Sequence, residues 1–585
     1  MRRMILGIVA VVIGLALIVT LISLTVQDTS PPTVAKLLSR MSLADKIGQM
    51  TQAARDYLQP GDITKYRLGS VLSGGGSVPA SNTVAGWRDM ISDFQKEAAA
   101  TPLKIPILYG ADAVHGHNNL HNATIFPHNI GLGAARDADL VYRVERATSE
   151  ELKATGIPWT FAPCVAVVQD LRWGRTYEGF SKDPALVSQL AAAAVRGFQG
   201  DNLGDTGVMV SVKHFAADGG TQGGKDQGDA VITPEQLNTL FLPPYAAVMS
   251  LHPGSVMASF SSINGLKMHA NKALLTDWLK VKEGFDGFIV SDWAAVKQLP
   301  GTSADQIAAA VNAGIDMVMV PDTFASFIQD LTDDVKSGKV PQSRIDDAVS
   351  RILSVKIRLG LFKKPIPDSP MNLDAHKILA QEAVEKSFTL LKNDQGVLPL
   401  KAGQTILVIG PKADDVGSQC GGWTQTWQGS RGDITAGETI LAGLKRRFGA
   451  DHVLFRPDGT LGSDPVKADV TIFVEGESPY AEGRGDSETL LPDYNDLQIF
   501  AAWKESAMAD KPLITLVISG RPLVMNGIIA RSQAVAALWL PGSEAGHEAE
   551  VLAGDVKATG KLPQPWPSNA DQTKTVWPLG YGLSD

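Results

Sequence analysis

The sequence predicts an α/β fold in which a (β/α)8-type TIM barrel precedes an α/β sandwich domain. The first observation behind this prediction is the length of 585 residues, which is too long for one hydrophobic core and favours two or more domains. The second is an alternation of short apolar runs with helix-like stretches, which is typical of parallel α/β architectures. The third is a proline-rich interruption, after which the alternation begins again.

Residues 1–28 are expected to form an N-terminal membrane anchor or signal segment. Arg2 and Arg3 precede residues 4–26, which contain no charged side chain. This run matches the ~20 residues that span a bilayer, and the arginines would keep its start in the cytoplasm. Residues 21–26 offer no small-residue cleavage site. We therefore expect an uncleaved anchor with the body facing the periplasm or exterior; cleavage, which stays open, would give a secreted or periplasmic protein.

Residues 29–362 are expected to form the barrel. Seven apolar runs in this region have the character of strands: 69–72, 107–110, 160–163, 208–212, 256–259, 288–290 and 317–320. Several of them are followed closely by a polar or charged residue, namely Asp112, Lys213, Asp292 and Asp322. Because a barrel gathers the carboxyl ends of its strands at one mouth, these side chains are expected to meet there.

A linker and a second domain follow. Residues 363–374 are dense in proline, which resists both helix and sheet. Residues 375–585 begin with a helical stretch at 375–391, and three buried parallel strands are predicted at 406–410, 470–474 and 513–518. An acidic, glycine-bearing loop at 475–486 follows the second strand, in the position where open α/β sheets bind ligands.

Charge and cysteine content exclude several classes of function. The net charge of −9 is mild for this length and argues against a nucleic-acid partner. Cys164 and Cys420 are far apart and show no ligand spacing, so neither a disulfide framework nor a zinc site is indicated. His115, His117 and His121 lack a carboxylate or cysteine to complete a ligand set. We predict no metal and no cofactor, and the oligomeric state stays open.

The corner after the apolar run 288–290 carries the first chemical signal. There Asp292 is followed directly by Trp293. On this segment alone, a helix-capping aspartate is as good an interpretation as a catalytic one. A carboxylate beside a flat aromatic surface nevertheless suggests sugar chemistry, and cleavage of a glycosidic bond needs two carboxyl groups. The acidic loop of the second domain offers Glu475, Glu477, Glu482 and Asp486.

Eight short motifs then point to one family. In chain order they are GADAVHG at 110–116, RWGR at 172–175, KHF at 213–215, VSDW at 290–293, CGGW at 420–423, GESPYAE at 476–482, SGRP at 519–522 and LGYGL at 579–583. Together they resemble the two-domain β-glucosidases and β-glucan exohydrolases of glycoside hydrolase family 3, from about residue 34 to the end.

The resemblance implies catalytic roles for two carboxylates. Asp292 would be the nucleophile of a retaining mechanism, and nearby cations are expected to keep its pKa low. Glu482 would be the acid/base, which protonates the departing oxygen and then activates water. Glu477, slightly upstream, competes for that second role.

The resemblance also implies a pocket for the terminal sugar. Its residues would be Asp112, Arg175, Lys213 and His214, with Asp226 as a weaker candidate. Carboxylates accept hydrogen bonds from sugar hydroxyls, and arginine and lysine donate to them. The alternative is a structural ion-pair network at the barrel mouth. Arg172 is expected to be structural.

Aromatic residues extend this comparison. Trp293 and Trp427 resemble the two walls that hold the next sugar in the exohydrolases, whereas Trp423 is expected to pack in the core of the second domain. Phe260 stands where the family often has a tyrosine near the nucleophile, so that hydrogen bond to Asp292 is lost.

The resemblance implies an exo-acting β-glucosidase that releases terminal β-D-glucose from β-glucans and oligosaccharides. Ala294 and Gln298 stand where the plant-like exohydrolases are charged, so the preference for the second sugar is expected to differ. The alternatives are a β-N-acetylhexosaminidase or β-xylosidase of the same family, or a membrane-tethered sugar-binding protein without turnover. The hexosaminidases carry a histidine-bearing loop after KHF, whereas this chain has Ala-Ala-Asp-Gly at 216–219.

Overall fold

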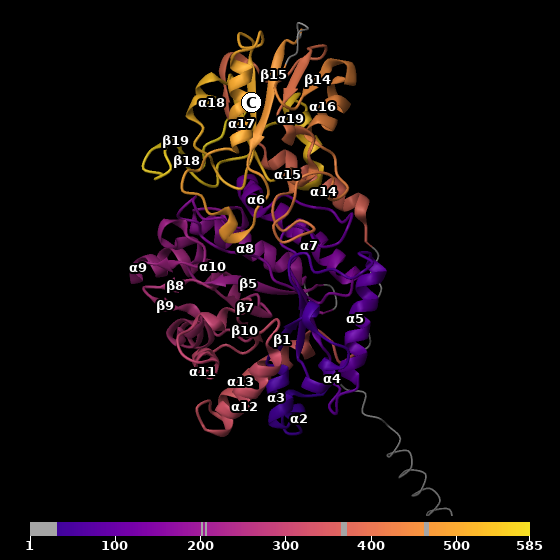
Figure 1. Cartoon of the computed structure of the whole chain (residues 1–585), viewed down its shortest axis with the longest axis vertical. Coiled ribbons are helices and arrows are strands. Elements are labelled where there is room, and N and C mark those ends of the chain that lie inside the picture. The colour runs from indigo at the N-terminus through magenta and orange to yellow at the C-terminus, as the bar shows by residue number, and fades with distance from the viewer. Residues whose placement is uncertain (1–31, 201–202, 205–206, 364–370, 461–466, 585) are drawn as a thin grey trace, which may run out of the picture.

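Two sheets organise the chain, one in each half (Figure 1). The computed structural model describes residues 32–200, 203–204, 207–363, 371–460 and 467–584. The first half, coloured indigo to magenta, surrounds its sheet with helices, and the orange-to-yellow second half lies above it in this view. This arrangement of a barrel followed by a mixed α/β sheet confirms the predicted fold class.

The first sheet is a parallel barrel. Its strands are β1 (Thr51–Ala54), β2 (Ser70–Ser73), β3 (Leu108–Ala111), β4 (Trp159–Thr160), β5 (Met209–Phe215), β7 (Ser255–Ala258), β10 (Phe288–Val290) and β11 (Val318–Met319). They pair in the order β10-β7-β5-β4-β3-β2-β1-β11. A parallel bridge between Val290 and Met317 closes the ring. All eight carboxyl ends therefore face one mouth.

Seven of these strands overlap the predicted apolar runs, and β1 is the strand that the sequence did not reveal. Its residues Thr51, Gln52, Ala53 and Ala54 are all buried, but half of them are polar. The buried Nε2 of Gln52 donates to Ser70 Oγ at 2.8 Å, and the Thr51 hydroxyl donates to the carbonyl of Ile47 at 2.8 Å. Strand β1 is thus held by hydrogen bonds inside the barrel as well as by apolar burial, which hides it from a hydrophobicity pattern.

Helices cover the outside of the barrel. The longer ones are α5 (Val84–Ala99), α7 (Ala138–Ala154), α8 (Pro184–Gln199), α11 (Ser303–Ala313), α12 (Phe324–Lys336), α13 (Gln342–Arg358) and a π-helix at Ala273–Lys282; shorter ones are α2 (Val34–Leu38), α3 (Leu43–Gln49), α4 (Asp62–Tyr66), α6 (Asn129–Ala135), α9 (Pro234–Gln236) and α10 (Pro243–Met249). Helix α8 shows why they start where they do: Asp183 caps the amide of Ala185, and Pro184 occupies the first helical position.

The second sheet is parallel apart from one edge strand. It consists of β12 (Thr389–Asn393), β13 (Ile406–Ile409), β14 (Val453–Arg456), β15 (Val470–Gly476), β16 (Leu513–Ile518) and β17 (Ala534–Trp539), in the order β12-β17-β16-β15-β13-β14 with β12 antiparallel. Its helices are α14 (Leu373–Ser387), α15 (Val416–Cys420), α16 (Ile440–Phe448), α17 (Tyr494–Lys504), α18 (Asn526–Arg531) and α19 (Glu548–Leu552). The predicted strands correspond to β13, β15 and β16.

The predicted helix at 375–391 is wrong at its end. Helix α14 stops at Ser387, and Thr389 to Leu391 belong to β12, which pairs with β17 from Thr389 opposite Ala537. The apolar side chains of Leu390 and Leu391 are each 1% exposed. Pairing with a sheet edge buries these leucines and satisfies their backbone, which a helical pattern taken alone does not anticipate.

Two predicted segments fall wholly or largely outside the described residues: the anchor at 1–28 and residues 364–370 of the linker. Across the part of the chain that the structure does describe, every helix is too short or too polar to cross a bilayer.

Candidate active site

A cavity of about 830 Å³ lies at the barrel mouth, and residues from both halves of the chain line it. Eight of the nine predicted site residues are among them: Asp112, Arg175, Lys213, His214, Asp292, Trp293, Trp427 and Glu482. The ninth, Asp226, does not line the cavity. Because parallel strands of a barrel present their carboxyl ends at one mouth, residues more than a hundred positions apart in sequence meet here.

Asp292 lies two residues after the end of β10 and is 8% exposed. Its Oδ1 accepts a hydrogen bond from the backbone amide of Trp293 at 2.7 Å, and its own amide donates to His269 Nε2 at 3.1 Å. Its Oδ2 is buried and makes no hydrogen bond within the described residues. One carboxylate oxygen is therefore held by the backbone, and the other is left to react with a ligand.

The expected low pKa of Asp292 is wrong. Burial raises its pKa to about 6, although Arg175, the Trp293 amide and Lys213 act in the opposite direction. The loss of hydration thus outweighs the neighbouring cations. Asp292 is ionised above this pH and protonated below it.

Lys213 and Asp112 form a buried ion pair that lines the same cavity. Lys213 Nζ donates to Asp112 Oδ1 at 2.9 Å, and the two residues are 2% and 9% exposed. Burial disfavours the charge on Lys213, but the carboxylates of Asp112 and Glu178 outweigh it and raise its pKa. The lysine therefore stays charged and keeps two further protons for a ligand.

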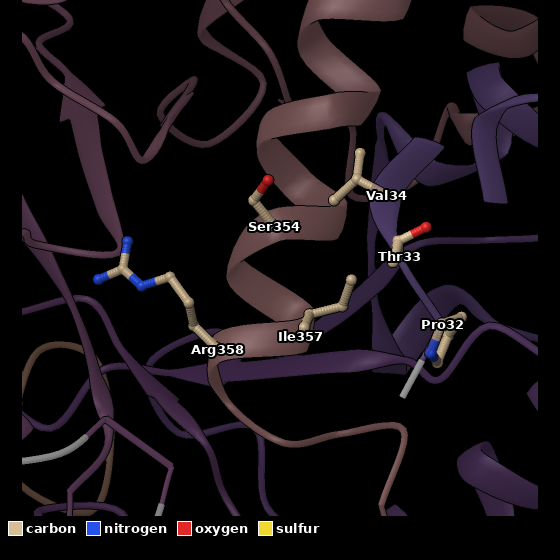
Figure 2. A pocket seen from close by; sticks show the side chains of 6 residues that line it. All are labelled: Pro32, Thr33, Val34, Ser354, Ile357 and Arg358. Carbon is tan, nitrogen blue, oxygen red and sulfur yellow. The ribbon is translucent and has the colours of Figure 1, made fainter. Parts of the chain in front are cut away.

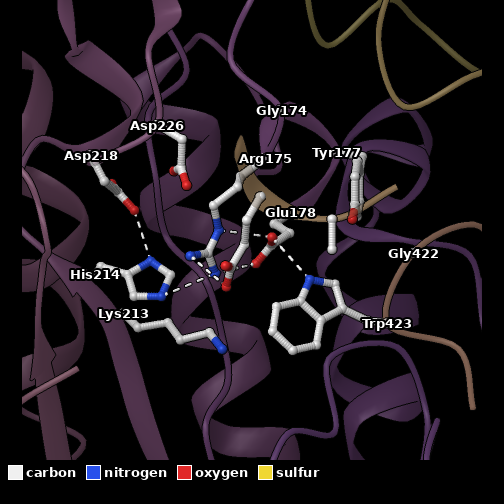
Figure 3. Close-up of polar contacts among 12 residues, drawn as sticks. Gly174, Arg175, Tyr177, Glu178, Lys213, His214, Asp218, Asp226, Gly422 and Trp423 are labelled. Atoms are coloured by element: carbon white, nitrogen blue, oxygen red, sulfur yellow. Dashed lines mark hydrogen bonds and ion pairs between the residues drawn. The ribbon is translucent and has the colours of Figure 1, made fainter. Parts of the chain in front are cut away.

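Arg175 is the hub of the polar contacts (Figure 3). Its Nε and Nη2 donate to the two oxygens of Glu178, both at 2.9 Å, and Nη2 also lies 3.2 Å from His214 Nε2. Its Nη1 donates to Glu482 Oε1 at 3.4 Å, across the boundary between the two halves. The guanidinium thus connects a barrel histidine with the carboxylate of the second domain.

His214 is fixed by a second buried carboxylate. Its Nδ1 donates to Asp218 Oδ2 at 2.8 Å, while Nε2 lies 3.8 Å from Asp292 Oδ2. Burial, Arg175 and Lys213 hold the pKa of His214 well below its usual range, so the ring is neutral. With a proton on Nδ1, Nε2 accepts from Arg175.

Glu482 lies in the loop after β15 and its side chain is 20% exposed. Burial raises its pKa to about 7; Arg175 opposes this shift and Asp292 adds to it. A carboxyl group with this pKa carries a proton for a large part of the time near neutral pH, as a general acid must.

Glu477, the competitor for the acid/base role, is engaged elsewhere. Its Oε1 accepts from Arg521 Nε at 2.9 Å, and its Oε2 accepts from the Tyr480 hydroxyl at 2.9 Å and the Gly520 amide at 3.1 Å. It does not line the cavity. These contacts give Glu477 a structural place in the second domain.

Two exposed tryptophans flank the cavity. Trp293 and Trp427 are 39% and 44% exposed, far more than most aromatic residues of the chain. The loop after β2 passes close to both: a Cβ on Gly74 would lie 3.2 Å from the Trp293 ring, and one on Gly75 would lie 3.0 Å from Trp427 Cα. The glycines thus allow the loop to pack between two aromatic surfaces.

Trp423 departs from the expectation that it only fills the core. It is 5% exposed, but it lines the cavity, and its Nε1 donates to Glu178 Oε1 at 3.1 Å. Lys213 Nζ lies 5.6 Å from its ring centroid. Trp423 therefore belongs to the wall behind the charged pocket.

Asp226 and Arg172 lie next to the site. Asp226 Oδ1 accepts from the indole of Trp173 at 3.0 Å, and its charge contributes to the raised pKa of Glu482. Arg172 pairs with Asp170 at 2.6 Å, as expected of a structural residue. Asp322, another predicted strand-end residue, is exposed and pairs with Lys297 at 3.3 Å outside the cavity.

Phe260 lines the cavity from the segment after β7, the neighbour of β10 in the barrel. Its ring centroid lies 6.5 Å from that of His269, the acceptor for the Asp292 amide. A phenylalanine donates no hydrogen bond, which is consistent with the unpartnered Oδ2 of Asp292.

Sequence reasoning missed several polar residues of the site: Arg55, Asp56, Ser77 and Gln227 line the cavity, and Glu178, Asp218 and His269 lie buried beside it. The last three hold predicted site residues in place. Each is at most 5% exposed and contacts a predicted site residue directly. Glu178 and Asp218 stand three and four positions after their partners Arg175 and His214. This short spacing could have predicted both pairs. His269 follows no predicted strand, and no pattern in the sequence connects it with Asp292.

Metal-ligating atoms come together once among the described residues. Cys164, His214 and Asp218 offer atoms within 4.8 Å of one another, all buried. The histidine and aspartate already share a hydrogen bond, and burial strongly favours the neutral thiol of Cys164 by raising its pKa. Of the three histidines considered earlier, His115 stacks on His128 and His117 bonds to Thr155.

A second hollow, of about 430 Å³, lies beside α2 and α13 (Figure 2). It is lined by Pro32, Thr33, Val34, Ser354, Ile357 and Arg358. The described residues of its lining include no carboxylate, and Arg358 is already engaged with the carbonyl of His252 at 2.7 Å. This hollow offers no acid/base chemistry.

Comparisons with known proteins agree with this geometry. Residues 42–355 match the family described as glycosyl hydrolase family 3 N terminal domain, and residues 388–584 match glycosyl hydrolase family 3 C-terminal domain. A lysosomal beta glucosidase from Dictyostelium discoideum is 34% identical over 91% of this chain and 72% of its own length. A periplasmic beta-glucosidase from Salmonella typhimurium is 32% identical over 92% and 74%. The crystal structure of an exo-1,3/1,4-beta-glucanase from a Pseudoalteromonas species superposes with a TM-score of 0.90 at 40% identity, covering 94% of this chain and 73% of that one.

Proposed function

The chain belongs to glycosyl hydrolase family 3 and is a glycoside hydrolase, and on that premise we propose that it is a retaining, exo-acting β-glucosidase. It would release terminal β-D-glucose from the non-reducing ends of β-glucans and their oligosaccharides. The observation that carries this proposal is that Asp292 from the barrel and Glu482 from the second domain line one cavity. Retaining hydrolysis needs two such carboxyl groups in unlike environments.

In the first step, Asp292 Oδ2 attacks the anomeric carbon. Its availability supports this role, because Oδ1 is held by the Trp293 amide and Oδ2 makes no bond within the described residues. As the bond from Oδ2 to carbon forms, the bond from carbon to the leaving oxygen breaks, and Glu482 gives that oxygen its proton. The product of this step is a glycosyl ester on Asp292 and a free alcohol.

In the second step, water releases the sugar. Glu482, now ionised, takes a proton from water as the water oxygen bonds to the anomeric carbon. Asp292 leaves as a carboxylate, and both groups return to their starting states. The raised pKa of Glu482, about 7, supports both halves of this cycle, because the group exchanges its proton near neutral pH.

The charged pocket would hold the terminal sugar. Asp112 offers a carboxylate to hydroxyl donors, and Lys213 and Arg175 donate to hydroxyl oxygens from fixed positions. The aromatic surfaces of Trp293 and Trp427 lie at the same cavity and would hold the second sugar by its C–H faces. Charged side chains around the terminal sugar and aromatic side chains around the second sugar favour the removal of one terminal sugar at a time.

Two alternatives remain distinguishable. A β-xylosidase would use the same carboxylates but accept a sugar without the exocyclic hydroxymethyl group. A β-N-acetylhexosaminidase would place a histidine-bearing loop after KHF, whereas here Asp218 occupies that segment and binds His214. The names of the periplasmic and lysosomal relatives favour action outside the cytoplasm for this chain also.

A substrate panel tests the proposal. Purified protein is assayed with aryl β-glucoside, β-xyloside and β-N-acetylglucosaminide, and with β-1,2, β-1,3, β-1,4 and β-1,6 glucose disaccharides. We expect release of glucose with retained anomeric configuration, read by NMR at early times. Faster turnover of the xyloside or N-acetylglucosaminide, or inversion of configuration, would refute the β-glucosidase assignment. Binding of glucose without any turnover would favour a sugar-binding protein.

A further inference from the structure

The Glu482 loop belongs to the second domain but reaches over a cavity of the barrel. Glu482 itself has a backbone φ of 55°, in the left-handed region that a residue with a Cβ rarely adopts. Such a conformation persists only where surrounding contacts impose it. The contacts that fix the loop therefore determine where the carboxyl group stands.

Arg521 makes one set of these contacts. It follows β16 and is 2% exposed. Its Nη2 donates to the carbonyl of Gly485 in the loop at 2.5 Å, and its Nη1 donates to the barrel carbonyls of Leu171 at 3.1 Å and Arg172 at 3.2 Å. Its Nε is held by Glu477 at 2.9 Å. One planar guanidinium thus ties the loop to the barrel and to the second sheet.

Asp486 makes the other set, from within the loop. Its Oδ1 accepts from the barrel amide of Gly174 at 2.9 Å, and its Oδ2 accepts from the barrel amide of Asp226 at 2.9 Å. Gly174 permits this approach, because a Cβ there would lie 2.0 Å from the carbonyl oxygen of Glu482. The loop and the barrel therefore meet backbone to backbone.

These contacts end on the segment that carries Arg175. The backbone of residues 171–174 accepts hydrogen bonds from Arg521 and donates one to Asp486. The next residue is Arg175, whose Nη1 lies 3.4 Å from Glu482 Oε1. Asp486 and Arg521, both within the described part of the chain, do not line the cavity. They act on the site chiefly through the loop they hold, because Arg175 on the neighbouring barrel segment is fixed separately by both oxygens of Glu178.

We propose that Asp486 and Arg521 form a latch across the domain boundary and act as positioning residues for the acid/base carboxyl of Glu482. The inference rests on the proposed function. It predicts that weakening the latch displaces the proton donor far more than the nucleophile and the sugar pocket, whose residues are held by contacts within the barrel. The defect should therefore depend on how much the leaving group needs a proton.

The test compares kcat/KM on two substrates in several variants. In cellobiose the leaving group is the 4-oxygen of the second glucose, which needs a proton to depart, whereas 2,4-dinitrophenolate departs without one. For Asp486→Ala we expect a loss of about 10²-fold on cellobiose, the cost of a misplaced catalytic group. On 2,4-dinitrophenyl β-glucoside we expect less than a threefold loss, since general-acid help contributes little there. Asp486→Asn, which can accept only one of the two amides, should fall between the parent and Asp486→Ala.

Arg521→Lys keeps the charge but cannot reach both the loop and the barrel carbonyls, and it should show the same split. Because Arg521 is buried, the kinetics of Arg521→Lys are interpreted only if its melting temperature equals that of the parent. If this variant unfolds, the variants of the exposed Asp486 decide the test. Arg484→Ala, an exposed substitution in the same loop, is the matched control and should leave both substrates unaffected.

The outcomes separate the latch from the proposed function. Equal losses on both substrates, or no loss on either, with an active parent enzyme would overturn the latch and leave the β-glucosidase assignment standing. A parent enzyme that hydrolyses neither substrate would overturn the proposed function and the latch with it.

Discussion

The barrel and the second domain each contribute a carboxylate to the cavity, and they hold it in different ways. Asp292 lies two residues after a barrel strand, is 8% exposed, and has its backbone amide and one carboxylate oxygen fixed by hydrogen bonds within the barrel. Glu482 stands on a loop with a left-handed backbone, and its side chain is 20% exposed. The proposed nucleophile is thus positioned by the sheet itself, and the proposed acid is positioned by docking of one domain on the other.

Because of this difference, we expect substitutions of the two carboxylates to reduce turnover in different ways. Loss of the strand-end group should abolish turnover of every substrate, because no bond to the sugar then forms. Loss of the loop group should be graded by substrate, because some leaving groups depart without a proton.

The largest effect is expected for Asp292→Asn. An amide cannot act as the nucleophile, so kcat should fall by about 10⁴-fold or more on every substrate, as for other essential nucleophiles. A 2-deoxy-2-fluoroglucoside should label Asp292 in the parent enzyme, detected by peptide mass spectrometry. The matched control is Asp322→Asn, a strand-end aspartate outside the cavity, which should remain active. Covalent label on another acid would refute the assignment.

Glu482→Gln should give the next largest effect and should show the difference between the halves. On cellobiose we expect a loss of about 10²- to 10⁴-fold in kcat/KM, the usual contribution of a general acid. On 2,4-dinitrophenyl β-glucoside kcat/KM should be nearly unchanged, and azide should speed turnover by attacking the glycosyl intermediate without base help. Glu477→Gln is the control: it should lower the melting temperature and gain nothing from azide.

The same variant tests the pH dependence. In the proposed mechanism the parent needs Asp292 ionised and Glu482 protonated, and their pKa values are about 6 and about 7. Activity should therefore rise as pH increases through the first value and fall as it increases through the second, with a maximum between them. In Glu482→Gln the alkaline fall should disappear and the acid rise should remain. An alkaline fall that persists would mean that another group supplies the proton.

The two halves also differ in how far the sequence predicted them. Asp292, Lys213 and Asp112 could be predicted because they come just after apolar runs, and barrel topology brings the ends of strands together. Lys213 itself lies within β5, near its carboxyl end. Glu482 could be named only through a family resemblance, since nothing in the loop 475–486 distinguishes it from Glu477. That choice depends on the side chains of Arg521 and Tyr480, which engage Glu477 from positions that no local pattern connects.

Buried polar residues account for most of what the sequence did not predict. Strand β1 is half polar, and Trp423 is buried yet bonded to Glu178 in the cavity wall. Sequence patterns report burial as apolarity, so a polar group that is satisfied inside the protein escapes them. The pKa of Asp292 was misjudged for a related reason: residue types show the nearby cations but not the loss of hydration that outweighs them.

A smaller effect is expected for Trp427→Ala, which removes the aromatic wall that the second domain contributes. Stacking on one ring is worth up to about a tenfold change in affinity, so kcat/KM on laminaribiose should fall by that order. On β-glucosyl fluoride, which has no second sugar, it should be unchanged. Tyr494→Ala, an exposed aromatic of the same domain outside the cavity, should affect neither substrate. Equal losses on both substrates would place Trp427 at the first sugar instead.

The smallest effect, a shift of the acid side of the pH profile, is expected for Phe260→Tyr on the barrel side. Phe260 lines the cavity from the segment after the strand neighbouring β10, and Asp292 Oδ2 has no hydrogen-bond partner within the described residues. A phenol that donates to this oxygen would stabilise the ionised carboxylate and lower the pKa of Asp292 from about 6. Because the nucleophile acts in its ionised form, the acid limb of kcat/KM should move to lower pH by about one unit. Phe260→Leu adds no hydrogen-bond donor and should leave the acid limb in place. An alkaline limb that stays fixed in both variants would show that the pKa of Asp292 can be changed without changing the pKa of Glu482.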